Sequence, residues 1–182
     1  LAKDPEYRDL MTWMDLGLGE RVSRYFKTPT DSSDLVNRRE MIERSTRLGG
    51  AVVLLIKEIG TDALFALDVV TDHLDNHAGG QYNPRVKAFY EECKKRDLSL
   101  AVAQTDVKGD RSLLPSQQEH PDYFVHIVEE RDDGIVVRGA KAHTTCAPYV
   151  DELIVLPTRA FKDEDAAYAV AFAVPVNAPG LK

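Results

Sequence analysis

Two polar stretches of this 182-residue chain hold most of the side chains that could do chemistry. The first, residues 104–116, is rich in groups that can hold a ligand and poor in groups that could form a core. Within it, Lys108 to Ser112 combines a glycine, which lets backbone amides approach a ligand, with an arginine that can grip a phosphate or carbonyl oxygen. The alternative is an ordinary loop in which Asp110 and Arg111 make local contacts.

The second polar stretch, residues 141–147, contains a lysine, a histidine, two threonines and a cysteine. His143, Thr144 and Thr145 could supply imidazole and hydroxyl contacts to a flat heterocycle. The alternative is a polar cluster at the end of a strand, and the residues alone leave both open.

Other chemistry-bearing patterns are weaker. His73 and His77 are four residues apart, so on a helix they would share a face and could bind a metal. No third ligand is in view, which favours a solvated helix end. Cys93 and Cys146 lie in different halves of the chain, so we expect neither a disulfide nor a cysteine-built metal cluster. The sequence has no P-loop, G-x-G-x-x-G, H-E-x-x-H or G-x-S-x-G motif.

A β-hairpin is the element that must position the two polar stretches. Its arms are residues 123–130 and 135–139, and Asp132-Asp133-Gly134 between them is typical of a tight turn. Because the polar stretches flank this hairpin, a small sheet can bring both to one edge. We therefore predict a single site built from two loops.

The chain before the hairpin is predicted to be helical. Residues 1–31 read as irregular, and Ser32 or Ser33 could cap a helix that ends at Gly60. Its second half, residues 49–56, is apolar almost all round, which predicts burial among other helices. A second helix would run from Thr61 to about His77, with these residues on its buried side: Leu64, Leu67, Val70 and Leu74. A third would begin at Asn83-Pro84, with this inner face: Val86, Phe89, Tyr90 and Cys93.

The hydrophobic period changes from 3.6 to 2 at about Leu98. Strands are predicted at residues 98–102, in the hairpin, and at 150–156 and 169–176. The fold class is therefore α+β, with an N-terminal helical domain at 1–97 and an antiparallel β domain at 98–182.

Bulk properties exclude several functions. A net charge of −7 with scattered basic residues does not suit a nucleic-acid binder, and 43% hydrophobic residues suffice for a core. No apolar run approaches the ~20 residues needed to cross a bilayer, and no signal peptide opens the chain, so we expect a cytoplasmic protein without membrane contact. Leu1 and the uncapped end at Lys182 suggest cuts through a longer chain.

Several segments together resemble one family of flavin enzymes. They are TDVKGDRS, HPDYFVHIVEERDDGIVVRGAKAHTT, DELIVLPT and FAVPVNAPGLK, with DPEYRDLM and LVNRREMIERS nearer the start. The family is typified by 4-hydroxyphenylacetate 3-monooxygenase (large component) and 4-hydroxybutyryl-CoA dehydratase. The resemblance implies an acyl-CoA-dehydrogenase-like architecture. This chain would hold the N-terminal helices and an incomplete middle β domain, and the C-terminal helical bundle, which makes homo-oligomers, would be missing.

The resemblance also implies bound FAD and assigns residues to it. The first loop would approach the flavin through Gln104, Thr105 and Asp106. The same loop would be shaped by a second group, which could reach the cofactor: Asp110, Arg111 and Ser112. The second loop would contact the flavin through Thr144 and Thr145.

The activity that the resemblance favours is that of a flavin-dependent monooxygenase. A separate flavin reductase would supply reduced FAD, and an aromatic or similarly flat substrate would be hydroxylated with O₂. The first alternative is a 4-hydroxybutyryl-CoA dehydratase/vinylacetyl-CoA isomerase-like enzyme, with an acyl-CoA substrate and His143 as acid–base catalyst. In the dehydratase branch, cysteines bind an iron–sulfur cluster. The matching positions of this chain hold other residues, Leu54 and Glu58 among them, so we expect no iron–sulfur cluster. The second alternative is an inactive fragment, or a subunit whose partner brings the bundle.

Overall fold

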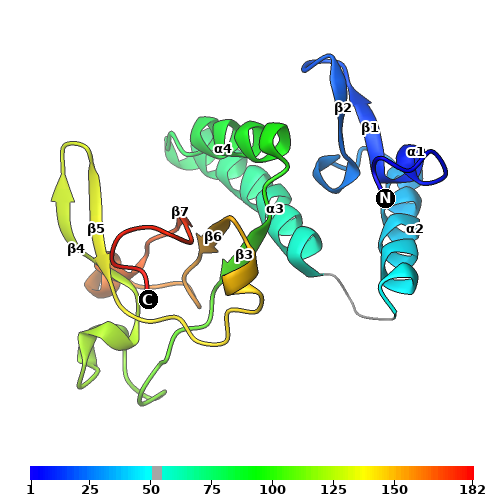
Figure 1. Cartoon of the computed structure of the whole chain (residues 1–182). Helices are drawn as coiled ribbons and strands as arrows, with labels where there is room; N and C mark the ends of the chain where they lie inside the picture. Colours follow the sequence, from blue (N-terminus) through cyan, green and yellow to red (C-terminus); the bar gives the residue numbers. More distant parts are fainter. Residues whose placement is uncertain (51–54) are drawn as a thin grey trace. The chain divides into compact units, whose positions relative to one another are not determined.

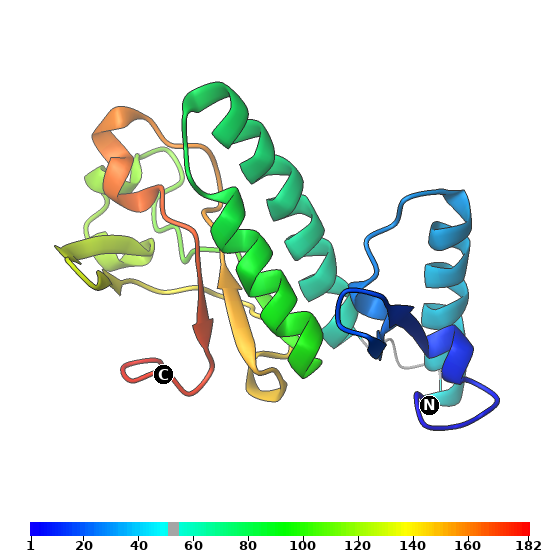
Figure 2. The same cartoon turned by 90° about the horizontal axis from the view of Figure 1, so that it is seen from above.

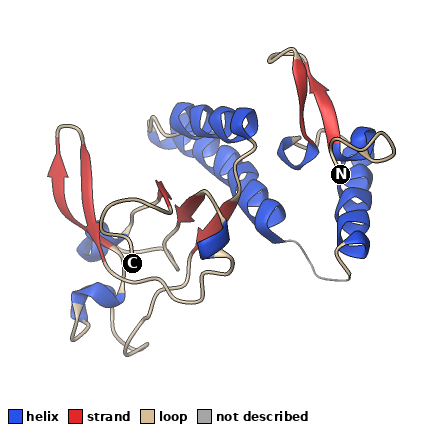
Figure 3. Ribbon diagram, in the orientation of Figure 1, coloured by secondary structure: helices blue, strands red, loops and turns tan. Residues whose placement is uncertain are grey.

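The computed structural model describes residues 1–50 and 55–182, and it divides into two compact units, Leu1–Leu100 and Ala101–Lys182 (Figure 1). Each unit is described by itself. The first contains the long helices and a small hairpin, and the second contains most of the strands (Figure 3). Both kinds of secondary structure therefore occur, as the α+β prediction requires, although the first unit is not purely helical.

The first unit opens with a hairpin where we had expected irregular chain. Helix α1 (Arg8–Met11) leads into strands β1 (Thr12–Asp15) and β2 (Glu20–Ser23), which pair antiparallel. The Asp15 carboxylate accepts hydrogen bonds from two turn amides, and the turn closes at a glycine with φ of +70°. The prediction failed because strands of four residues are too short to show a period.

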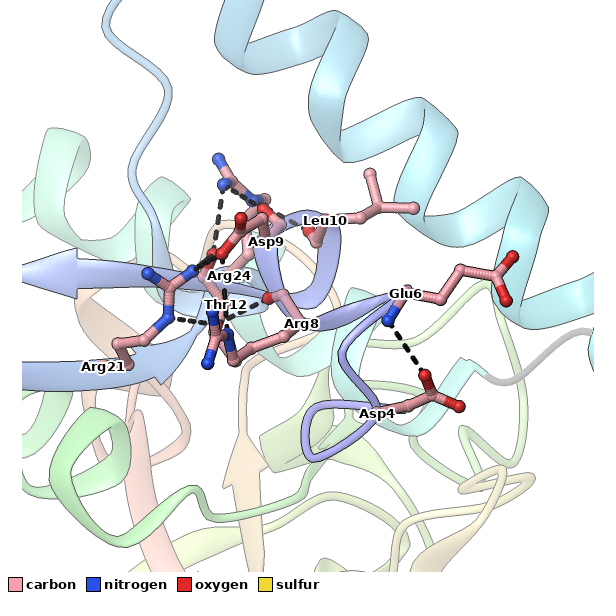
Figure 4. A network of polar contacts seen from close by, with 8 residues as sticks. All are labelled: Asp4, Glu6, Arg8, Asp9, Leu10, Thr12, Arg21 and Arg24. Carbon is pink, nitrogen blue, oxygen red and sulfur yellow. Dashed lines mark hydrogen bonds and ion pairs between the residues drawn. The ribbon is translucent and has the colours of Figure 1, made fainter.

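Two arginines tie this hairpin to α1, as Figure 4 shows. Arg24 donates to the carbonyl oxygens of Leu10 at 2.8 Å and Asp9 at 2.7 Å. Arg21 donates to the Asp9 carboxylate and to the Thr12 hydroxyl. Arg24 thereby satisfies carbonyl groups that a helix end leaves without intrahelical partners.

The boundaries of the next two helices correct the prediction. Helix α2 (Ser32–Leu48) is capped by Asp31, whose carboxylate accepts from the Asp34 amide at 3.0 Å, rather than by Ser32 or Ser33. The helix ends at Gly49-Gly50, not at Gly60. The predicted all-apolar run falls largely on residues outside those described.

Gly60 lies inside helix α3 (Leu55–Ala78), so it does not act as a helix terminator. A Cβ atom built on Gly60 would lie 2.3 Å from the Leu100 Cβ. The glycine therefore permits a close approach of α3 to the start of the next strand. The predicted buried side of α3 was only partly right, because Leu64 is buried while Val70 and Leu74 are exposed within the unit.

Helix α4 (Asn83–Arg96) packs along α3, as Figure 2 shows. Asn83 is the first helical residue and not the predicted cap. Its side-chain amide donates to the Asp68 carbonyl at 3.0 Å and to the Thr71 hydroxyl at 3.1 Å, which fastens α4 to α3. The predicted inner face is confirmed, with Cys93 fully buried and the other three residues half-buried.

The second unit contains two small groups of strands. Strands β3 (Leu100–Ala103), β6 (Glu152–Val155) and β7 (Phe172–Pro175) form one sheet in the order β3-β6-β7, in which β6 and β7 are antiparallel. Strands β4 (His126–Arg131) and β5 (Gly134–Arg138) form the predicted hairpin. All these strands fall where the sequence predicted, but most are shorter. No helix in the described part of the chain is long and apolar enough to cross a membrane.

Candidate functional site

The two polar loops run side by side in the second unit. Asp106 and Lys141 form an antiparallel bridge, and the Ala142 amide donates to the Thr105 carbonyl at 2.7 Å. The first loop leaves β3 and the second follows β5, so partners that are more than 30 residues apart become neighbours. The structure therefore brings Gln104, Thr105 and Asp106 next to the start of the second loop.

Asp106 is the hub of this junction. It is 3% exposed, and its carboxylate lies 2.6 Å from the Lys141 ammonium. The Thr158 hydroxyl contacts the other carboxylate oxygen, and the Val125 amide donates to the carboxylate at 3.4 Å. These contacts occupy the carboxylate with protein partners, so the geometry makes Asp106 a residue that positions the loops.

Lys141 and Thr158 complete the junction. The Lys141 ammonium also donates to the carbonyl oxygens of Gln104 at 3.1 Å and Leu156 at 2.8 Å, while the Thr158 hydroxyl lies 2.8 Å from the Gln104 carbonyl. The sequence reasoning assigned neither residue a role. No local pattern could have done so, because their partners are up to 54 residues away.

The other half of the first loop is a tight turn. Lys108 and Gly109 are both left-handed, with φ of +78° and +54°. The buried Gln118 amide clamps the turn, since it accepts from the Asp110 amide at 3.0 Å and donates to the Asp110 carbonyl at 2.7 Å. Ser112 donates its hydroxyl and its amide to the Asp110 carboxylate, which lowers the pKa of Asp110. The predicted residues Asp110 and Ser112 therefore bond each other.

A cavity of about 160 Å³ adjoins this turn. The predicted residues Asp110 and Arg111 line it, and so do Lys108, Thr158 and Arg159. Its other walls are Leu113 and Phe124, and the Arg159 guanidinium lies 5.9 Å from the centre of the Phe124 ring. Three basic side chains against one carboxylate suit an anionic group such as a phosphate.

The second loop presents exposed polar side chains. His143 and Thr145 are exposed, and Thr144 is half-buried. His143 has a φ of +56°, which is uncommon for a residue other than glycine and costs backbone energy. All three residues follow directly after Ala142, which is bonded to Thr105, so they begin at the junction of the two loops.

His73 and His77 are exposed residues of helix α3. Their rings stack with centres 4.1 Å apart, and the His77 ring meets the His73 carbonyl oxygen. Among the described residues, no group of three or more His, Cys, Asp or Glu side chains is arranged to hold a metal ion. His77 is the penultimate residue of α3, so the pair lies at the C-terminal end of this helix.

Known proteins resemble this chain along its entire length. It is 39% identical to a 4-hydroxybutyryl-CoA dehydratase/vinylacetyl-CoA-Delta-isomerase of Clostridium aminobutyricum, over 100% of this chain and 36% of that protein. It is 29% identical to a 4-hydroxyphenylacetate 3-monooxygenase oxygenase component of Thermus thermophilus, over 100% of this chain and 36% of that protein. The chain thus spans about a third of the length of these relatives.

Solved structures agree. An oxygen-tolerant archaeal 4-hydroxybutyryl-CoA dehydratase from N. maritimus superposes with a TM-score of 0.87 at 30% identity, over 96% of this chain and 35% of that one. The oxygenase component (HpaB) of 4-hydroxyphenylacetate 3-monooxygenase complexed with FAD superposes with a TM-score of 0.81 at 28% identity. The superposition covers 99% of this chain and 36% of that one. The family model described as "4-hydroxyphenylacetate 3-hydroxylase N terminal" matches residues 1–182. The chain therefore belongs to the 4-hydroxyphenylacetate 3-hydroxylase family and corresponds to the N-terminal region of its members.

Proposed function

We propose that this chain is part of an FAD-dependent oxidoreductase, a monooxygenase that uses reduced flavin on an aromatic or similarly flat substrate. The observation that carries the proposal is the junction of the two loops at Asp106 and Lys141, beside a cavity with three basic side chains. The relatives support it. One solved structure with this fold is complexed with FAD. Proteins similar in sequence are named as oxygenase components of monooxygenases.

The chemistry of the exposed residues fits a flavin nucleotide. The ring system of FAD offers carbonyl and nitrogen acceptors, and its diphosphate offers negative charge. The amide or hydroxyl groups of Gln104, Thr105, Thr144 and Thr145 would hold the ring. Lys108, Arg111 and Arg159 would hold a phosphate. The cavity of about 160 Å³ admits a phosphate or a ring edge, so the rest of the cofactor would lie along the exposed loops.

The bound flavin would supply the redox chemistry with O₂. This chain's share would be to position the flavin and to keep water from it, for which a rigid junction of the loops is needed. Asp106, Lys141 and Thr158 would provide that rigidity because their contacts are buried. Asp110 and Ser112 would keep the turn in shape while Arg111 remains available to the ligand.

The whole protein would have an acyl-CoA-dehydrogenase-like architecture. Within it, we place a helical domain at residues 1–97 and a middle β domain that begins at residue 98. The C-terminal helical bundle and the homo-oligomer it makes would belong to the full-length form. A flavin reductase is the proposed partner, and the cytoplasm is the proposed location.

A second candidate function follows from the higher identity to the dehydratase. That branch includes a relative at 39% identity and a solved structure that superposes with a TM-score of 0.87, and both support an enzyme like 4-hydroxybutyryl-CoA dehydratase/vinylacetyl-CoA isomerase. In this chain we expect it to lack an iron–sulfur cluster, because Leu54 and Glu58 stand at positions that match cluster cysteines. The exposed His143 imidazole would then be the acid–base catalyst on an acyl-CoA substrate. Turnover without O₂ and without a reductase would favour this candidate over the monooxygenase.

Flavin binding tests the proposal. The purified chain is titrated with oxidised FAD and, under anaerobic conditions, with reduced FAD. Fluorescence follows the binding, which should be stoichiometric. Arg111→Ala and Thr145→Ala should each weaken it about tenfold, the effect of losing one hydrogen bond to a charged or buried partner. Arg131→Ala, which removes an arginine exposed at the tip of the β4–β5 hairpin, is the matched control and should bind as the wild type does.

Equal binding by all three variants would contradict the two-loop site. If the folded chain binds no flavin, the titration is repeated with the C-terminal region restored. Binding regained only then would identify the chain as a part that is inactive alone, whereas continued absence would reject the flavin proposal.

A further inference from the structure

A larger cavity, of about 630 Å³, is lined by residues of the first unit alone and shares none of them with the loops just described. This volume is in the range of pockets that hold small organic molecules. Part of its wall is apolar, with Met11 and Val22 among the lining residues. The cavity therefore has room for a ligand with an apolar body.

The charges around this cavity favour an anion. Four basic side chains line it against two carboxylates, although the whole chain has a net charge of −7. Three of the four already pair with carboxylates: Arg21 with Asp9, Lys57 with Asp97 and Lys94 with Asp15. Lys95 is exposed, and within the described residues it forms no ion pair, so its ammonium is available to a ligand.

Two hydroxyl groups meet in the wall of the cavity, with a buried carboxyl behind them. Tyr25 and Ser45 both line the cavity, and their hydroxyl oxygens are 3.4 Å apart. The Tyr25 hydroxyl is also 3.4 Å from one carboxyl oxygen of Glu58. Glu58 is 6% exposed, and its other carboxyl oxygen is buried and has no hydrogen-bond partner among the described residues. A buried unpartnered oxygen is costly and rare, which marks this group as one with a further role.

We propose that this cavity binds a small organic anion with an apolar body, which accepts a hydrogen bond from the Tyr25 hydroxyl, and that Glu58 controls the direction of that hydroxyl. Lys95 attracts the negative charge. The proposal concerns a site in the first unit and does not rest on flavin binding by the second.

The protonation state of Glu58 decides what Tyr25 can do. Ionised Glu58 accepts a hydrogen bond from the Tyr25 hydroxyl. This bond turns the hydroxyl proton away from the ligand. Protonated Glu58 can donate to the Tyr25 oxygen instead, which leaves the hydroxyl proton for the ligand. Burial raises the pKa of Glu58, so the protonated form persists to higher pH than in an exposed glutamate. Burial also raises the pKa of Tyr25, so its hydroxyl stays protonated.

The other charged groups that face Glu58 act in opposite directions. Arg38 of α2 lowers the pKa of Glu58, and Asp62 of α3 raises it. Arg38 is itself engaged by Asp62, with a nitrogen–oxygen distance of 2.6 Å, so its effect on Glu58 is reduced. Affinity for the anion is therefore expected to fall as the pH rises through the pKa of Glu58.

The test uses benzenesulfonate, an aromatic anion that stays charged between pH 4 and 8.5, titrated into the full chain by calorimetry. The single tryptophan, Trp13, is paired with the lining residue Val22 and gives a second readout by fluorescence. Wild-type affinity should fall about fivefold over this range, as expected for one lost hydrogen bond. Tyr25→Phe should weaken binding about fivefold at pH 4, and Lys95→Gln should weaken it at every pH.

Glu58→Gln separates the proposal from a merely structural role. A glutamine side chain does not titrate, so binding should become independent of pH. Tyr82→Phe, at an exposed tyrosine outside the cavity, is the control and should leave affinity unchanged. The neutral analogue benzamide should bind more weakly than benzenesulfonate. No binding of benzenesulfonate, wild-type affinity in Tyr25→Phe, or an unchanged pH dependence in a folded Glu58→Gln variant would each overturn the proposal.

Discussion

The Lys141 ammonium lies 2.6 Å from the Asp106 carboxylate, with the two side chains only 10% and 2% exposed. This pair is the main electrostatic contact between the two polar loops. Both partners make further hydrogen bonds, to Thr158, Val125, Gln104 and Leu156. A buried ion pair of this kind is costly to break, because removal of one partner leaves the other charged and shielded from water.

Lys141→Met should therefore destabilise the second unit by about 3 kcal/mol. Methionine keeps much of the side-chain volume but removes the charge, so the loss reports on Asp106 left without its counter-ion. The free energy of unfolding from urea titration, followed by hairpin and loop signals in NMR spectra, measures the effect. Arg138→Gln breaks the more exposed pair with Asp122 and should cost less than about 1 kcal/mol. Equal losses in the two variants would show that the Lys141 pair does not hold the loops together.

Gly109→Ala should destabilise the tight turn by about 2 kcal/mol or more. The φ of +54° disfavours alanine, and the added Cβ would lie 2.4 Å from the side-chain oxygen of Gln118, which clamps the turn. Thermal unfolding measures the loss. Gly134→Ala is the matched control, because nothing lies within 4 Å of its Cβ position and its φ is not positive. A Gly109 variant as stable as the Gly134 variant would contradict the description of the turn.

Asp34 should contribute to stability in a pH-dependent way. The hydrogen bond from Lys27 lowers its pKa from the usual 3.8 to about 2, and Thr30 donates to it through its amide and hydroxyl. Because the pKa in the folded chain lies below the unfolded value, the stabilisation is complete above pH 4 and is lost as the pH falls towards 2. Its size is about 2 kcal/mol.

Urea titrations of wild type and Asp34→Asn between pH 2 and pH 6 measure this contribution. The difference in unfolding free energy should be largest at pH 6 and nearly absent at pH 2. Asp132→Asn, in the exposed hairpin turn, should differ little from wild type at any pH. A difference for Asp34→Asn that does not change with pH would refute the linkage.

Local chemistry was enough to predict some elements. The β4–β5 hairpin forms because alternating apolar residues flank an Asp-Asp-Gly turn, and helix α4 forms because Asn-Pro precedes an amphipathic stretch. Both signals involve residues close together in the chain. Gly60 misled the prediction, because a glycine that ends a helix and one that allows Leu100 to approach it have the same sequence signal.

Local patterns were sufficient to predict the mixture of helices and strands, the hairpin and, through the motifs, the family to which the chain belongs. Only the tertiary structure decided that Asp106 meets Lys141 and Thr158, that Gln118 clamps the turn at Gly109, and that Glu58 is buried behind Tyr25. These contacts join residues that are 8 to 52 positions apart in the chain. Their energies depend on burial and on the partner brought by the fold, and neither is encoded in a local pattern.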